Sequence, residues 1–424
     1  MKELAAHDAT TTRDTASLTL SERLRALGPG AMVAACILGP GSITTLSVAG
    51  AEYGFTLLWA AIAASIVAFC FQRPVIRFTL ATNTSAMEGI RERMGQKWAT
   101  ALYGALLLGA VAFQAGNFTG AALALNFLLP SVPILAWVSV LAVAALLMCW
   151  VGIYRLLENI NRVIIGLIVL SFVLTLAFAG PEPGEVLATG FSFSVPEGNY
   201  WLILALIATT LPPNTVLGLS AFIKRKYAQD TTTPMEKRLA LSRFDHSTNV
   251  IITGVVMVSI LLCSAAAIHP LGTSVSGAAD MAGQLTPVLG QYAGVLFSLG
   301  LWAAGFSSGL FNIAVQPPLL GEATGRDENP RSTRNRVVML FAALAPIVIV
   351  ALFGSTPIEL ILTAQAVNGL LLPAIVGSIW ILCNQREKLG TLANTWRQNL
   401  IYGAVMLIVC LLALRVFLGM LGVI

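Results

Sequence analysis

Long apolar stretches separated by short polar segments recur from about residue 28 to the end of the chain. Most are long enough to cross a bilayer as a helix, which takes about 20 residues, and the longer ones are expected to tilt or to extend beyond the membrane. The pattern predicts an all-α integral membrane protein. We place about eleven spanning helices near residues 28–50, 55–80, 99–127, 131–151, 161–180, 198–222, 246–268, 286–320, 337–354, 357–384 and 400–422.

Composition agrees with a membrane location, since 57% of residues are hydrophobic and 11% are charged. A soluble protein carries about 25% charged residues. Residues 1–27 are polar and lack the apolar region of a signal peptide, so we expect a flexible cytoplasmic tail. Within it, the segment LSERLRAL predicts a short amphipathic helix with Ser21 as its N-cap. Residues 28–424 then form a single transmembrane domain.

The basic residues predict the orientation of the chain. Of its 25 Lys and Arg, all except Arg415 lie in the tail, or in and beside the loops that follow helices two, four, six, eight and ten. Because cytoplasmic loops are rich in Lys and Arg, we expect a multi-pass protein of the plasma (inner) membrane, with its N-terminus cytoplasmic and its C-terminus outside. The net charge of +5 therefore reflects topology and indicates a lipid bilayer as partner, with no nucleic acid. The oligomeric state stays open, a monomer included.

Two predicted helices contain residues that disfavour a helix interior. The first carries Gly39, Pro40 and Gly41 within CILGPGSITTLSVAG, and the sixth carries Pro212 and Pro213 within ATTLPPNTVLG. A proline removes a backbone donor and clashes with the preceding turn. Either helix alone could be kinked without further meaning, because membrane helices tolerate such breaks.

The positions of the two breaks match. They fall in the first helix of each of two five-helix halves, about residues 28–180 and 198–384, with an extra helix at 400–422. The halves would cross the membrane in opposite directions. Interrupted helices at corresponding positions of inverted repeats indicate the midplane substrate site of a secondary transporter.

Several motifs resemble the NRAMP family of divalent-metal transporters. The run LGPGAMVAACILGPGSITTLSVAGAEYGFTLLW is similar to the family's first helix, in which a leading GPG precedes Asp-Pro-Gly-Asn. The stretches GIYRLLENINRVI, SRFDHSTNVIITG, VLFSLGLWAAGFSSG and TAQAVNGLLLP agree as well. The resemblance runs from about Gly28 to the end of the chain. It implies the inverted-repeat fold of LeuT-type transporters.

The family's metal ligands are largely replaced. At the positions of the first-helix Asp and Asn this chain carries Gly39 and Ser42, while the glutamine of helix ten is kept as Gln365. A bare Mn²⁺ or Fe²⁺ ion in a low-dielectric site needs anionic or strong donor ligands. We therefore expect no metal site of the family's kind.

The sixth helix has also lost side chains of the family's motif. The family's motif there is Ala, two spacers and Met-Pro-His-Asn. Ala208 and Asn214 are kept, whereas Leu211 stands at the Met position and Pro213 at the His position. We also expect no proton coupling through the family's acids and histidines. We expect no Asp or Glu deep in a helix, and expect Glu158 and Asp245 at cytoplasmic helix ends, paired with arginines.

What remains is a set of small and neutral polar groups. The candidate substrate-binding residues are Gly39, Ser42, Thr45, Ala208, Thr209, Leu211, Asn214, Gln365 and Asn368. Further polar residues of helices three and eight either join this site or serve helix packing. These are Gln114, Asn117, Thr119, Ser307, Ser308 and Asn312.

The predicted function is transport of a small solute by alternating access. The leading substrate is a divalent cation carried largely hydrated, as suits Mg²⁺, because Mg²⁺ keeps much of its water. Alternatives are a transporter of a small neutral or zwitterionic organic solute and a non-transporting membrane sensor or scaffold. No cofactor and no catalytic group are expected, since the sequence contains neither HExxH nor GxSxG.

Overall fold

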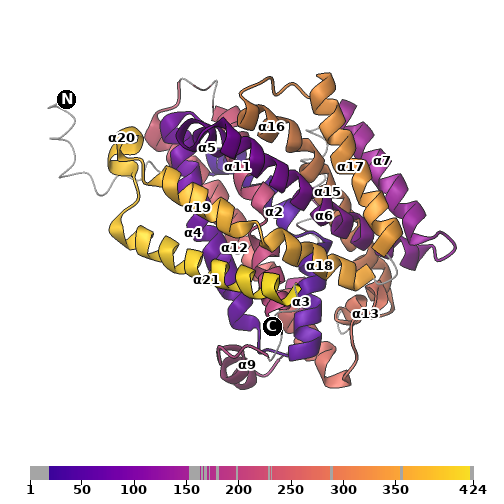
Figure 1. Cartoon of the computed structure of the whole chain (residues 1–424). Helices are drawn as coiled ribbons and strands as arrows, with labels where there is room; N and C mark the ends of the chain where they lie inside the picture. The colour runs from indigo at the N-terminus through magenta and orange to yellow at the C-terminus, as the bar shows by residue number, and fades with distance from the viewer. Residues whose placement is uncertain are drawn as a thin grey trace.

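The computed structural model describes most of the chain. The described residues are 19–151, 163, 166, 170, 172–177, 181–196, 199–227, 230, 232–286, 290–353 and 357–420. Their regular structure is entirely helical (Figure 1). In chain order the helices are α1 (Leu20–Ala26), α2 (Pro29–Ile37), α3 (Pro40–Tyr53), α4 (Leu58–Thr82), α5 (Ala86–Met94), α6 (Gln96–Leu128), α7 (Ile134–Val151), α9 (Pro183–Gly190), α10 (Tyr200–Thr210), α11 (Pro213–Tyr227), α12 (Met235–Ala267), α13 (Ala278–Gly283), α15 (Ala293–Ala314), α16 (Gln316–Thr324), α17 (Thr333–Phe353), α18 (Pro357–Gly369), α19 (Leu372–Cys383), α20 (Arg386–Leu389) and α21 (Trp396–Met420).

The two predicted breaks are present. The first predicted helix is divided into α2 and α3, and the sixth into α10 and α11. Pro40 and Pro213 each open the second half at its first turn, where a missing N–H costs least. The chain therefore turns out of one half-helix and directly into the next, which leaves backbone termini in the interior of the bundle.

Two further helices, predicted to be continuous, are also divided. The predicted helix 286–320 becomes α15 and α16, with prolines in the first turn of α16, and the predicted helix 357–384 becomes α18 and α19. In addition, α12 begins at Met235 rather than near residue 246. Nine helices in the described part of the chain, counting the broken sixth, eighth and tenth as one each, are long and apolar enough to cross a membrane. The predicted fifth helix, 161–180, lies mostly outside the described residues.

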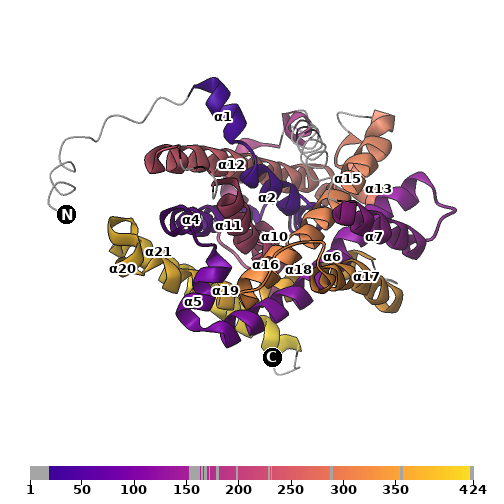
Figure 2. The same ribbon diagram turned by 90° about the horizontal axis from the view of Figure 1, so that it is seen from above.

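The end of the expected tail is structured from Leu20 onward. Helix α1 packs on α12, as Figure 2 shows from above. Its N-cap is Thr19 rather than Ser21, because Thr19 and Glu22 stand three residues apart and complete a capping box. Lys237 of α12 hydrogen-bonds Glu22 at 2.5 Å and, with Thr19, lowers the pKa of that carboxyl to about 2. The carboxyl of Glu22 is therefore charged at neutral pH, and its ion pair with Lys237 connects α1 to α12.

The first and sixth helices, broken into α2 and α3 and into α10 and α11, lie inside the bundle. Helix α3 packs on α12 and α6, while α10 packs on α18 and α4. Helix α6 also contacts α15 and α18, α7 pairs with α17 on one side, and α19 pairs with α21 on the other (Figures 1 and 2). Large exposed apolar side chains on α7, α17 and α21 fit a lipid-facing perimeter. The arrangement buries the breaks and their polar side chains.

Candidate functional site

The first break is enclosed by polar groups from helices α6 and α15. Gly39 is the N-cap of α3 and has no side chain to fill the space. A Cβ placed there would lie 3.0 Å from Oγ of Ser308 and 3.1 Å from Oδ1 of Asn117. Ser308 in turn donates to the carbonyl of Cys36 at the end of α2, at 3.1 Å. The position at which the family resemblance expects a carboxylate thus faces two neutral polar side chains.

Ser42 and Thr209 connect the two breaks. Ser42 donates its hydroxyl to the carbonyl of Ile37 at the end of α2, and its oxygen lies 2.5 Å from the hydroxyl oxygen of Thr209 on α10. Both residues are fully buried. The two residues were predicted from separate segments, and the fold brings them into direct contact.

Gln365 of α18 closes over the start of α3. A Cβ at Gly41 would lie 1.8 Å from Nε2 of Gln365, so the amide occupies the place where any other residue would carry its side chain. The residue is completely buried, and neither of its amide atoms has a hydrogen-bond partner within the protein. Gly41 therefore leaves room for the close approach of this amide.

Other buried polar side chains around the breaks also lack hydrogen-bond partners within the protein. Both amide atoms of Asn117 and Asn368 and the hydroxyl of Thr45 have no protein partner. Asn368 lies against α6, since a Cβ at Gly109 would be 2.9 Å from its Oδ1. Most buried polar groups are hydrogen-bonded, and a buried amide left unpaired costs about 1–3 kcal/mol. These side chains are therefore suited to hold a polar ligand or water.

Asn214 belongs to a different polar chain. Its Nδ2 donates to Oδ1 of Asn312 at 3.1 Å, and Asn312 donates to the side chain of Gln114 and to the carbonyl of Ala110. The amides of α11, α15 and α6 are thus joined beyond the sixth-helix break. Asn214 keeps one unpartnered atom, Oδ1.

Ala208 and Leu211 have packing roles. Ala208 lies on α10 against Gly369, the last residue of α18, where an added Cβ would approach it to 3.1 Å. Leu211 ends α10, and its backbone N–H donates to Ile207. Both side chains are buried and apolar, so neither offers a donor or acceptor to a solute.

The electrostatics of the site come from helix ends. Helices α2 and α10 end at the breaks, where each C-terminus carries about half a negative charge, and α3 and α11 begin there, where each N-terminus carries about half a positive charge. Among the described residues no group of three His, Cys, Asp or Glu could hold a metal ion. The site therefore combines partial charges of both signs from the helix ends with neutral hydroxyls and amides.

Asp245 has a role that the sequence did not predict. It is buried in α12, where its carboxylate accepts hydrogen bonds from the backbone N–H groups of Gly28 and Gly30, at 3.2 and 2.8 Å, and from Asn249. The expected pairing with Arg243 is wrong, because the described residues place no ion pair on Asp245. The carboxylate instead caps the N-terminus of α2, the first half of the broken helix. Glu158 lies outside the described residues.

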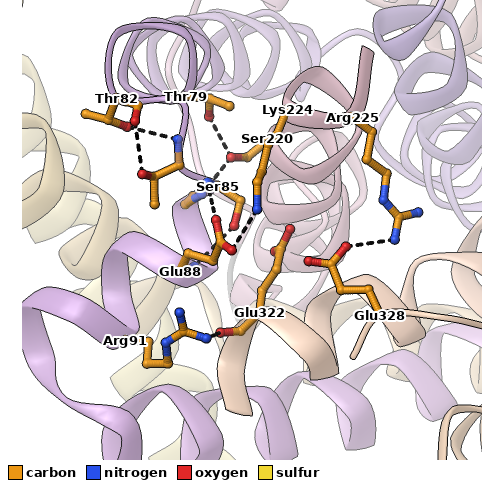
Figure 3. A network of polar contacts seen from close by, with 12 residues as sticks. Thr79, Thr82, Ser85, Glu88, Arg91, Ser220, Lys224, Arg225, Glu322 and Glu328 are labelled. Carbon is orange, nitrogen blue, oxygen red and sulfur yellow. Dashed lines mark hydrogen bonds and ion pairs between the residues drawn. The ribbon is translucent and has the colours of Figure 1, made fainter. Parts of the chain in front are cut away.

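A polar network holds the far end of α11, the second half of the sixth helix (Figure 3). Lys224 pairs with Glu88 of α5 at 2.6 Å, and Ser220 bonds Thr79 of α4 and the backbone of Ala86. The side chain of Glu322 points toward the Lys224–Glu88 pair.

Glu322 was also missed from the sequence, which predicted no acid deep in a helix and ended the eighth helix at residue 320. It lies on α16, is 2% exposed, and has one carboxyl oxygen without a hydrogen-bond partner. Arg91 donates to its backbone carbonyl at 2.7 Å. The signal that could have revealed it is the double proline of QPPLLGEATG, which starts a new helix containing this residue.

A helical membrane bundle with two broken helices meeting at buried polar groups defines a LeuT-type membrane protein. A family model described as natural resistance-associated macrophage protein-like matches residues 30–419, so this chain belongs to the Nramp family. The divalent metal cation transporter MntH of Ralstonia nicotianae is 30% identical over 382 residues, which cover 88% of this chain and 85% of that protein. MntH of Deinococcus radiodurans is 28% identical and covers 87% and 84%.

Solved structures agree on the fold. A manganese transporter of Eremococcus coleocola aligns with a TM-score of 0.77 at 19% identity, over 96% of this chain and 90% of that one. MhsT, solved in complex with L-phenylalanine, aligns with a TM-score of 0.62 at 16% identity, over 92% and 97%. The inferred LeuT-type architecture is confirmed.

Proposed function

We propose that this protein is a secondary transporter that moves a divalent cation by alternating access around its two broken helices. The cation is carried largely hydrated, as suits Mg²⁺, rather than bare as Mn²⁺ or Fe²⁺ would be in the family's ligand set. Membership of the Nramp family and the names of the relatives support the transporter class and the divalent cation. The N-terminus lies in the cytoplasm and the C-terminus outside, as the distribution of Lys and Arg predicts.

One observation supports the hydrated form of the substrate. The buried amides of Asn117, Gln365 and Asn368 have no partner in the protein, and the surrounding hydroxyls and amides are neutral. Water molecules on Mg²⁺ donate hydrogen bonds, and amide and hydroxyl oxygens accept them. A bare transition-metal ion would lose its water without gaining an anionic ligand, so its desolvation would be uncompensated.

The carbonyl ends of α2 and α10 offer partial negative charge to such a cation, beside the N–H ends of α3 and α11. Half-helix C-termini and unwound carbonyls coordinate cations in transporters of this architecture. About half a charge at a helix end is weaker than a carboxylate, so it compensates the loss of first-shell water less well.

Uptake into proteoliposomes tests this function. We expect Mg²⁺ flux that exceeds Mn²⁺ flux at equal concentration, and Gln365→Leu to lower the Mg²⁺ flux at least tenfold while the protein stays folded. The matched change Gln96→Leu removes an exposed amide at the start of α6 and should leave the flux unchanged. Preferred Mn²⁺ flux that survives Gln365→Leu would contradict the proposal.

The neutral amides also favour a second candidate, a small neutral or zwitterionic organic solute. Amides offer donors as well as acceptors, and a site without a formal charge suits such a ligand. A thermal-shift screen separates the two, because a ligand that binds the folded state raises its melting temperature. Stabilisation by an organic solute and by no divalent cation would select this alternative. A chain without flux or ligand stabilisation would be a sensor or scaffold.

A further inference from the structure

A cavity of about 300 Å³ lies between α4, α12 and α21, away from the broken helices. Its walls come from the second half of α4, the first turns of α12 and the first turns of α21. The lining residues are Phe69, Cys70, Arg73, Pro74, Ile76, Arg77, Leu239, Arg243, Gln398, Ile401 and Tyr402. We call this space the arginine pocket.

Three guanidinium groups give the arginine pocket its character. Arg73 and Arg77 lie one turn apart on α4, and Arg243 faces them from α12. No lining residue is acidic, and within the described residues these three arginines form no ion pair. Three like charges in one concave space repel one another unless an anion lies between them.

The available donors point to an oxyanion. Arg77 uses one terminal nitrogen to donate to Asn394 at 2.6 Å, while its buried Nε has no partner. Arg73 lies over the ring of Phe69, 5.0 Å from its centre, which fixes the direction of that side chain. Guanidinium groups bind phosphate with two parallel hydrogen bonds, so this set suits a phosphate group.

The pocket is a built feature of the fold. Tyr402 of α21 packs edge-on against Phe71 of α4 at 4.2 Å, and its hydroxyl donates to the carbonyl of Cys70 at 3.4 Å. Phe69 stacks on His246 of α12, with ring centres 5.5 Å apart. Aromatic contacts thus hold all three helices together around the cavity.

The location suits a membrane lipid. Helices α12 and α21 begin here and α4 approaches its end, so the pocket lies at the end of the bundle that the positive-inside rule makes cytoplasmic. Ile401 lines the pocket and is 46% exposed, next to the more exposed Leu400. Apolar side chains at the mouth suit acyl chains, while the arginines suit a headgroup. Basic pockets between helices on the cytoplasmic side of a membrane bind anionic headgroups.

We propose that the arginine pocket is a binding site for a phosphate group, and that the headgroup of an anionic phospholipid of the inner leaflet supplies it. Its single negative charge would offset part of the repulsion among the three arginines, and its binding would join α21 to α4 and α12. The site is independent of the transport function proposed above, because none of its residues belongs to the breaks.

Thermal stability of the purified full chain in a neutral detergent measures this binding. The probes are dioleoyl-phosphatidylglycerol, dioleoyl-phosphatidylcholine and inorganic phosphate, each titrated separately. We expect saturable stabilisation by phosphatidylglycerol and none by phosphatidylcholine, weakening as salt screens the charges. Stabilisation by inorganic phosphate to the same plateau would show instead that the site binds a soluble anion, and it would overturn the assignment to a lipid headgroup.

Substitutions in the arginine pocket test whether the stabilisation by phosphatidylglycerol arises there. Arg73→Gln and Arg77→Gln should each weaken the apparent affinity about fivefold, the factor that corresponds to one arginine near an anionic surface. Gln398→Glu places a competing carboxylate in the pocket without removing an arginine, and should weaken binding as well. Arg336→Gln is the control, because it removes an exposed arginine on α17 outside the pocket.

Two results would overturn the proposal. One is an equal response of the wild type, the pocket variants and Arg336→Gln to phosphatidylglycerol, which would show a nonspecific charge effect. The other is stabilisation by neither phosphatidylglycerol nor inorganic phosphate. If the arginine variants misfold, Gln398→Glu alone decides between these outcomes.

Discussion

The hydroxyl oxygens of Ser42 and Thr209 lie 2.5 Å apart and join the two broken helices at the centre of the bundle. This side-chain hydrogen bond links α3 to α10, so a motion that moves these two helices apart would break it. Hydrogen bonds between membrane helices contribute about 0.6 kcal/mol on average.

We therefore predict that Ser42 and Thr209 are energetically coupled. Ser42→Ala and Thr209→Val should each lower the free energy of unfolding by about 1 kcal/mol, and the double variant should lose less than the sum. Reversible unfolding in mixed detergent measures the cycle. Thr253→Val is the control, since that hydroxyl bonds Asn249 within α12. Additive losses would show that the contact contributes nothing.

A carboxylate at residue 39 should change the choice of cation. Gly39→Asp points its side chain between Ser308 and Asn117, which must shift by a few tenths of an ångström to accept it. We expect Mn²⁺ to raise the melting temperature of this variant and to have little effect on the wild type, because an anionic ligand compensates desolvation. Gly184→Asp in α9 adds the same charge in open space. Equal responses of the two variants would show that residue 39 does not face the site.

Removing the charge of Asp245 should destabilise the first half-helix. Asp245→Asn weakens the two bonds from Gly28 and Gly30 and removes a negative charge from the start of α2, a loss of about 1–2 kcal/mol. Hydrogen exchange of α2 amides should increase more than that of α3 amides. Asp280→Asn, which affects the cap of the separate helix α13, should leave α2 exchange unchanged. Unchanged exchange in Asp245→Asn would refute the capping role.

We predict that the Lys224–Glu88 ion pair holds the C-terminal end of α11 against α5 and so limits access of solvent to the first break. Its side chains are 24% and 18% exposed, so it is screened less than the more exposed Arg225–Glu328 pair. Lys224→Met leaves Glu88 without its cation, and we expect severalfold faster alkylation of the buried Cys36 by a charged maleimide. Arg225→Met should have little effect.

The alkylation experiment uses a chain in which the other cysteines are replaced by serine or alanine. These are Cys70, Cys149, Cys263, Cys383 and Cys410. Equal rates in the Lys224→Met and Arg225→Met variants would show that the buried pair does not control access to the first break.

Prolines and apolar lengths could be interpreted from the sequence because they act locally. Pro40 and Pro213 open new half-helices as expected. The same signal was present at Pro317 and Pro373, where the breaks of the eighth and tenth helices were not predicted. Long apolar segments hide such breaks, because hydropathy continues across them while the backbone does not.

Partners of single polar residues could not be inferred in the same way. Asp245 was expected to pair with Arg243 two residues away, yet its bonds go to Gly28 and Gly30, 217 and 215 residues distant in the chain. Glu322 was missed since its burial arises from packing of α16 against α5 and α11. Such contacts depend on which helices are neighbours, which periodicity does not encode.

The sequence by itself determined the membrane location, the expected orientation, the two matching breaks and the neutral character of their side chains. Each follows from residue type and spacing, because burial in lipid, the preference of Lys and Arg for cytoplasmic loops, and backbone hydrogen bonding are properties of short segments. Tertiary structure decided which of those side chains meet. Ser42 reaches Thr209 and Gln365 covers Gly41 because packing brings α3, α10 and α18 together, and that packing is a property of the whole bundle.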